Sequence, residues 1–198
     1  MRPLVLLVVF ALVLTARQAF SQSTFALQYA INFPLSNTAD YIGATSFRGI
    51  SLDYRYSIQP NIAIGIGTGW YTFYEQKDYG TYSNDDGSLA ISGLQYRYIN
   101  SAPILLVGDY YFSPEEKFPL FVGLGIGITY NEVRTQMSQY YVHTDTWQFS
   151  LAPEVGVTFA GTTGVSGLLS VRYNNNFKTS ELDGQSYLTL NVGVKFGR

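Results

Sequence analysis

The chain alternates apolar and polar residues one by one over eight stretches, and each stretch predicts a β-strand. In the second stretch Ile50, Leu52 and Tyr54 take the even positions, whereas Ser51 and Asp53 take odd ones. Because successive side chains point to opposite faces of a strand, each predicted strand has one apolar and one polar face. The predicted strands are residues 25–33, 47–58, 62–75, a stretch within 94–112, 120–131, 147–159, 165–174 and 188–196.

The fourth predicted strand is the least regular of the set. The segment 94–112 is longer than the roughly 9 to 11 residues with which a tilted strand crosses a membrane. Pro103 has no N–H to donate, so we expect either a bulge at this residue or an extension of the strand beyond the membrane. Leu105 and Val107 are exceptions to the pattern, since they fall on the otherwise polar face.

The connections between the predicted strands alternate between short and long. The short ones, at 59–61, 113–118 and 160–164, are rich in turn-forming residues and are expected to face the periplasm. The long ones, at 34–45, 76–92, 132–144 and 175–185, are polar and are expected to be extracellular loops. An even number of strands with this alternation predicts an all-β fold, an eight-stranded antiparallel up-and-down transmembrane β-barrel with a filled polar lumen.

Glycine and aromatic residues indicate which face of the barrel points outward. An eight-stranded barrel has an interior just wide enough for side chains, so small residues are expected inside it. Nine glycines lie on the polar face: Gly49, Gly65, Gly67, Gly69, Gly123, Gly125, Gly127, Gly156 and Gly193. Aromatic residues of the apolar face gather near strand ends and are expected to lie at the two membrane interfaces: Trp70, Tyr74, Tyr110, Phe112, Tyr130, Trp147, Phe159 and Phe196.

The polar face also carries balanced charges. A basic residue that faces lipid at mid-depth costs about 2 to 4 kcal/mol, whereas opposite charges inside a narrow lumen can pair. We therefore expect a lumenal network of four acidic and four basic residues that fills the barrel. Its predicted members are Asp53, Arg55, Glu75, Arg97, Asp109, Glu154, Arg172 and Lys195. The alternative interpretation of these charges is a selectivity filter or a proton path.

The N-terminus predicts export from the cytoplasm. Arg2 precedes an apolar run from Leu4 to Leu14, and the small residues Ala19 and Ser21 suit cleavage before Gln22. We therefore expect a signal peptide at 1–21 and a barrel domain at 22–198. The run is too short for a transmembrane helix, which needs about 20 residues. Cleavage leaves 10 basic and 14 acidic residues, and this net charge of −4 gives no indication of a nucleic-acid partner.

Composition agrees with a membrane barrel. Charged residues make up 13% of the chain and aromatic residues 16%, so the sequence is lean in charge for a soluble domain. The mean hydropathy is nevertheless only +0.05, because a barrel interleaves its apolar residues with polar ones. The absence of cysteine excludes a disulfide framework and a thiolate metal site.

Three segments resemble the small eight-stranded outer-membrane barrels of Gram-negative bacteria, the OmpA-like, OmpX-like and porin-family proteins. They are YINSAPILLVGDYYF at 98–112, PLFVGLGIGITY at 119–130 and the closing strand LTLNVGVKF at 188–196. The resemblance covers nearly all of the mature chain and implies a location in the bacterial outer membrane. The closing strand is similar to the signal that the outer-membrane assembly machinery reads, although Gly197 and Arg198 follow Phe196 where many members end on the aromatic residue.

Catalysis and metal binding have little support in the sequence. The single histidine, His143, is expected in a long loop near Ser138, Thr144 and Asp145, but no nucleophile motif such as G-x-S-x-G occurs. The acidic stretch 84–87 does not have the spacing of a calcium loop. We expect no enzyme activity and no cofactor, although a lipid-modifying barrel enzyme and a soluble lipocalin-like cup are alternatives.

The expected function is a structural or surface-interaction role through the extracellular loops. The third and fourth predicted strands exceed the length that a membrane requires, so their hairpin is expected to project outward and to offer strand edges to a partner. The main alternative is a narrow passive channel for small solutes. The expected partners are outer-membrane lipids and lipopolysaccharide, the assembly machinery and a surface ligand.

Overall fold

The computed structural model describes residues 23–83, 90–137, 140–159, 161 and 164–197. The predicted signal peptide and its cleavage site lie outside the described residues, as does the acidic stretch 84–87. None of the helices in the described ranges is long and apolar enough to cross a membrane.

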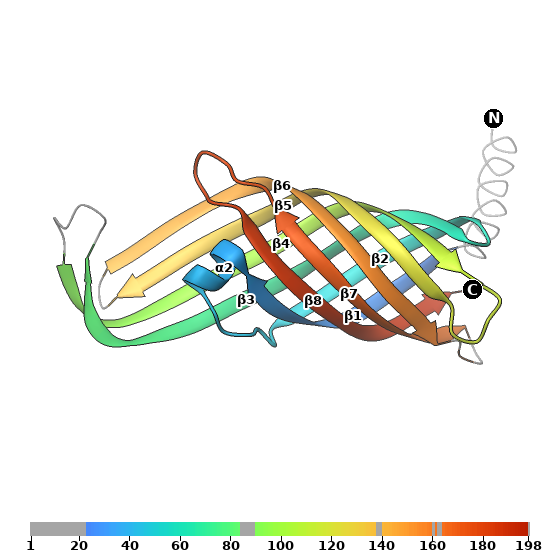
Figure 1. The fold of residues 1–198 in the computed structure, drawn as a ribbon, viewed down its shortest axis with the longest axis horizontal. Helices are drawn as coiled ribbons and strands as arrows, with labels where there is room; N and C mark the ends of the chain where they lie inside the picture. The colour runs from blue at the N-terminus through green and yellow to red at the C-terminus, as the bar shows by residue number, and fades with distance from the viewer. Residues whose placement is uncertain (1–22, 84–89, 138–139, 160, 162–163, 198) are drawn as a thin grey trace, which may run out of the picture.

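Eight antiparallel strands form a closed barrel in the order of the chain, and β1 closes the ring by pairing with β8 (Figure 1). Every neighbouring pair is antiparallel, so the predicted up-and-down topology is confirmed. The strands are β1 (Ser23–Leu35), β2 (Gly49–Gln59), β3 (Ile62–Ser83), β4 (Ala90–Phe112), β5 (Leu120–Met137), β6 (Tyr140–Phe159), β7 (Val165–Asn176) and β8 (Gln185–Gly197).

The alternation of residue types sets the two faces of the barrel wall. In β5 the exposed Leu124, Ile126 and Ile128 point outward, while Thr129 and Asn131 are buried inside. The other strands show the same division, with most large apolar side chains exposed and most buried positions polar or small, apart from the apolar side chains that fill the lumen. Exposed apolar surface on this scale is stable in lipid and unfavourable in water. The chain is therefore a transmembrane barrel with an apolar exterior, as expected, and not a soluble cup.

Four strands are far longer than the other four. β3, β4, β5 and β6 contain 22, 23, 18 and 20 residues, whereas β1, β2, β7 and β8 contain between 11 and 13. The long strands continue past the rim of the barrel as a four-stranded sheet, which we call the outer sheet (Figure 1). The prediction of loops at 76–92 and 132–144 was wrong for most of these residues, because polar strand residues outside lipid lack the apolar alternation that marks a membrane strand.

The interruptions of the strands differ in part from the prediction. Register with β3 and β5 runs through Pro103 without a shift, and the only irregularity between β3 and β4 in the described residues lies between Lys77 and Gly80. The long β4 is thus explained by its extension beyond the membrane rather than by a bulge at Pro103. A short helix, α2 (Ser36–Tyr41), occupies part of the first predicted long loop.

The lumen is filled in layers. Ala26, Phe121 and Leu168 form an apolar cluster near the end with the short turns. Along the barrel axis toward the outer sheet, this cluster is followed by a layer of charged side chains and then by a layer of uncharged polar side chains. At the outer mouth Ala30, Ile42, Tyr71, Phe73, Ile99 and Tyr187 form a second apolar cluster. Leu105 and Val107 face inward, as predicted, and pack with Ala152.

Candidate functional site

A cluster of five charged side chains lies inside the barrel, and we call it the lumenal charge cluster. It consists of Asp53 and Arg55 on β2, Asp109 on β4, Glu154 on β6 and Arg172 on β7. All five residues are buried. Since these strands lie on different sides of the ring, the cluster spans the whole cross-section of the lumen.

Arg172 bridges two carboxylates at the centre of this cluster. Its Nη2 donates to Glu154 Oε2 at 2.8 Å and to Asp53 Oδ2 at 3.1 Å. Its Nε donates to the same Glu154 oxygen at 3.0 Å. Buried charges are stable only when they are paired and hydrogen-bonded, and Arg172, 1% exposed, is paired with two carboxylates through Nε and Nη2, while its Nη1 has no hydrogen-bond partner among the described residues.

Arg55 joins the remaining carboxylate to the cluster. Its Nε donates to Asp109 Oδ2 at 2.6 Å, and its Nη1 lies 3.3 Å from Asp53 Oδ1. Neutral side chains add two further bonds: Gln28 donates to Asp53 at 2.5 Å, and the Ser170 hydroxyl donates to Glu154 at 2.5 Å. The polar face of the sequence indicates Gln28 and Ser170 as lumenal residues, but it does not indicate their partners.

Glycines make room for these charged side chains. Asp53 pairs with Gly67 across β2 and β3, and Asp109 pairs with Gly123 across β4 and β5. A Cβ added at Gly67 would lie 2.5 Å from Asp53 Oδ1, and one at Gly123 would overlap Asp109 Oδ1. The glycines on the polar face thus provide the space that an eight-stranded lumen lacks.

Glu75 and Arg97 were predicted members of the network, but they lie apart from it in the outer sheet. Glu75 pairs with Lys77 at 2.8 Å and accepts from the Gly43 amide at 3.0 Å. Arg97 Nη1 donates to the Tyr41 carbonyl at 2.9 Å. The prediction of their place was wrong because side-chain parity indicates the face of a strand but not the height along the barrel axis.

These two side chains hold the segment that carries α2 against the outer sheet. The Arg97 guanidinium lies 4.9 Å from the centre of the Tyr41 ring, within range of a cation–π contact. The Thr38 hydroxyl donates to Gln185 at 2.9 Å, and Ile42 is fully buried in the outer apolar cluster. Partial burial raises the pKa of Glu75, but the hydrogen bonds from Lys77 and Gly43 outweigh burial and hold this pKa below its ordinary value.

Lys195 points into the lumen but makes no ion pair with any carboxylate of the described residues within 4.0 Å. Its Nζ lies 3.4 Å from the Tyr111 hydroxyl and 5.0 Å from the centre of the Tyr111 ring. The structure thus brings five of the eight predicted charges together, places Lys195 beside them and separates Glu75 and Arg97.

The predicted interfacial aromatic residues point outward. Near the short turns, Tyr110 and Phe112 contact each other with ring centres 5.2 Å apart, and Phe159 on β6 and Phe196 on β8 are exposed at the same end of the barrel. Toward the outer sheet Trp70 is exposed, Tyr130 packs on Trp147 and Tyr74 packs on Tyr98. Their placement at the two membrane interfaces stays a prediction.

The outer sheet has two open edges within the described part of the chain. The pairing of β3 with β2 ends at Tyr71, so residues 73–83 have no strand beside them on that side. The pairing of β6 with β7 ends at Ser150, and one further bond joins the Phe177 N–H to the Phe149 carbonyl. From residue 140 to residue 148, β6 is therefore paired with β5 on one side and has no described strand beside it on the other side.

The orientation of this open edge follows from the Phe149 bond. In an antiparallel pair the N–H and C=O groups of alternate residues point to the same side of the strand. Since Phe149 points its carbonyl away from β5, Tyr141, His143 and Asp145 also present their backbone groups at the open edge. Tyr140, Tyr141 and Val142 have exposed fractions of 54%, 53% and 64%.

His143 lies on this β6 edge and not in a loop as predicted. Its Nε2 is 3.2 Å from Glu132 Oε1 and 3.7 Å from Asp145 Oδ1, and its ring stacks on Tyr141. Ser138 lies outside the described residues, and Thr144 occupies the next position of β6. In the described ranges no three His, Cys, Asp or Glu side chains form a group that could hold a metal ion.

Comparison with known proteins gives a match in structure only. No family model matches the sequence, and no curated protein matches it significantly. Among solved structures, Neisserial surface protein A is 17% identical with a TM-score of 0.59, over 90% of this chain and 98% of that one.

Two further solved structures share the architecture. The attachment invasion locus protein Ail of Yersinia pestis is 14% identical with a TM-score of 0.50, over 88% of this chain and 97% of that one. The outer membrane protein OprG from Pseudomonas aeruginosa is 13% identical with a TM-score of 0.51, over 88% and 94%. The chain therefore has the fold of small bacterial outer-membrane β-barrels.

Proposed function

We propose that this protein is an outer-membrane barrel that binds an external partner through the outer sheet. The observation that carries the proposal is the open edge of β6 from residue 140 to residue 148. An unpaired strand edge presents backbone donors and acceptors to which an extended peptide can add as a further strand. The rigid barrel holds this edge beyond the membrane.

The side chains of the outer sheet fit a recognition surface. Tyr79, Tyr140 and Tyr141 are exposed on it, and tyrosine provides large contact area with few torsions to freeze. The name of Ail, the attachment invasion locus protein, which has the same fold, agrees with such a role. The proposed role is non-catalytic, and a fold shared at this level of identity does not carry a function by itself.

Lipid and assembly partners follow from the same proposal. The apolar belt would contact membrane lipids, and the outward-pointing aromatic and charged residues at its outer border would contact lipopolysaccharide. The closing strand β8 carries the segment 188–196 that resembles the signal for the outer-membrane assembly machinery.

The test is the selection of binding peptides from a random library on the refolded barrel in lipid nanodiscs. His143→Pro removes an N–H that faces the open edge and leaves the β5 side of the ladder intact, since Pro is tolerated at such positions. We expect enriched peptides to bind this variant at least about tenfold more weakly than wild type, because a backbone hydrogen bond and strand contact are lost.

His143→Ala is the matched control, because it removes the same side chain and keeps the backbone donor. It should bind the enriched peptides within about twofold of wild type. Equal binding by wild type and His143→Pro, or no enrichment above a nanodisc without protein, would refute binding at the β6 edge.

A further inference from the structure

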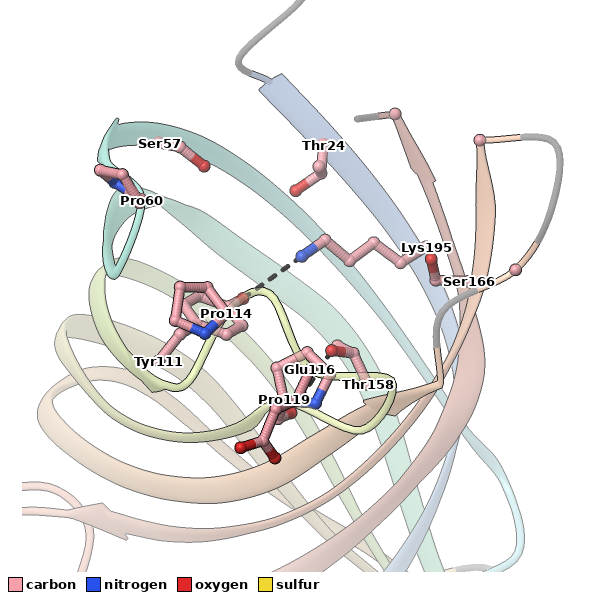
Figure 2. Close-up of a pocket in the computed structure, with 13 residues that line it drawn as sticks. Thr24, Ser57, Pro60, Tyr111, Pro114, Glu116, Pro119, Thr158, Ser166 and Lys195 are labelled. Atoms are coloured by element: carbon pink, nitrogen blue, oxygen red, sulfur yellow. Dashed lines mark hydrogen bonds between the residues drawn. The ribbon is translucent and has the colours of Figure 1, made fainter.

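The end of the barrel with the short turns contains a cavity of about 380 Å³ (Figure 2). This volume falls within the roughly 300 to 1,000 Å³ of small-molecule sites. The cavity is separate from the outer sheet and opens at the opposite end of the barrel. Polar side chains of four strands line it, and the turn prolines surround them: Thr24, Ser57, Thr158, Ser166, Pro60, Pro114 and Pro119.

Lys195 reaches into this cavity from β8 (Figure 2). Its ammonium group has three donors, but its contact among the described residues is the Tyr111 hydroxyl at 3.4 Å, beyond an ordinary hydrogen-bond length. Asp109 shares a small void with Lys195 on the inner side, where Arg55 binds its Oδ2 at 2.6 Å and its buried Oδ1 has no hydrogen-bond partner among the described residues. Since no carboxylate of the described residues lies within 4.0 Å of it, the ammonium group keeps donors that can turn toward the cavity.

The surroundings of Lys195 favour a negatively charged guest. The hydroxyl groups of Thr24, Ser57 and Ser166 belong to the same lining and can donate to oxygen. The Tyr111 ring, which packs on Phe121 at 5.3 Å, fixes one wall. Glu116 is the acidic residue of the lining, and it lies on the β4–β5 turn, where its amide donates to the Ser113 carbonyl. A charge-assisted hydrogen bond from an ammonium to an oxyanion is about twice as strong as a neutral one.

We propose that this cavity is a binding site for a small oxyanion group, with Lys195 as its charged ligand and the hydroxyls of Thr24 and Ser166 as further donors. A carboxylate and a phosphate share this chemistry. With the short turns toward the periplasm, the site takes its ligand from that compartment, either as a free small molecule or as the anionic end of a peptide.

The test is titration of the refolded barrel in detergent micelles with inorganic phosphate and, separately, with acetate. Binding is followed through the amide signals of Thr24, Ser166 and Lys195 by nuclear magnetic resonance. We expect saturable shifts at millimolar concentrations, and Lys195→Met should weaken the binding at least about tenfold by removal of a charge-assisted bond. Stronger binding of acetate assigns the site to carboxylates, and stronger binding of phosphate assigns it to phosphoryl groups.

Lys117→Met is the matched control, since Lys117 lies on a turn at the same end but does not line the cavity. It should bind within about twofold of wild type, as screened surface charges contribute little. Heat-modifiable gel mobility verifies that each variant forms a barrel. Should Lys195→Met fail to fold, Lys195→Arg should retain binding and Thr24→Val should weaken it.

The proposal would be overturned by shifts that rise linearly with anion concentration in the wild type. Equal affinity of wild type and Lys195→Met would overturn it as well. Equal loss of binding in Lys117→Met and Lys195→Met would show general attraction to the basic end and count against a defined site. These outcomes do not bear on the outer sheet, which the peptide selection tests separately.

Discussion

At Arg172 a single side chain connects three strands through Asp53 on β2 and Glu154 on β6. Replacement by Met leaves two buried carboxylates without this partner, and removal of one member of a buried ion pair costs about 3 to 5 kcal/mol. We therefore expect Arg172→Met to lower the free energy of unfolding by this amount, measured by urea titration in micelles. Lys178→Met is the control, because its pair with Asp183 is exposed and should contribute little.

Gly123 tests whether glycine provides space inside the lumen. Gly123→Ala places a Cβ against the Asp109 carboxylate, which Arg55 holds in place. Overpacking of a filled interior costs about 1 to 3 kcal/mol, and we expect a loss of this size in the same urea titration. Gly108→Ala should change stability by less than about 0.5 kcal/mol, because nothing lies within 4 Å of a Cβ at Gly108. Equal losses in both variants would disprove the packing argument.

At the scale of elements, we expect the barrel to fold without the part of the outer sheet that β3 and β4 form. Excision of residues 77–95 with an Asn-Gly turn between Gln76 and Tyr96 shortens β3 and β4 at a pair that is in register. The lumenal charge cluster and the outer apolar cluster involve none of the excised residues. We expect the shortened protein to keep its heat-modifiable mobility and a urea midpoint close to that of wild type. Loss of the folded band would show that the extension is required for the barrel.

At the scale of the whole molecule, the filled lumen opposes a channel. The charge cluster, the polar layer, the outer apolar cluster and α2 follow one another along the barrel axis. We expect no steady unitary conductance steps from the purified protein in planar bilayers, with a large porin as the positive control. Regular steps in the wild type that change in Arg172→Met would instead assign the cluster to a selectivity filter.

The sequence by itself determined the number of strands, their up-and-down order and the face of each strand that meets lipid. These properties depend on alternation with period two, which is local and survives in every membrane strand. Asp53, Arg55, Asp109, Glu154 and Arg172 could therefore be placed in the lumen.

Only the tertiary structure decided which charges meet. Contact across the lumen depends on strand stagger and tilt, which bring Arg172 to Asp53 but place Glu75 and Arg97 above the rim. The open edge of β6 was not predictable for a related reason. Outside lipid both faces of a strand meet water, so no alternation of residue types is imposed. Residues 140–144 were therefore predicted as part of a loop, although backbone pairing with β5 makes them a strand. Parity assigned Lys195 to the lumen correctly. That no carboxylate of the described residues lies within 4.0 Å of its ammonium group depends on the positions of the neighbouring strands, which only the tertiary structure gives.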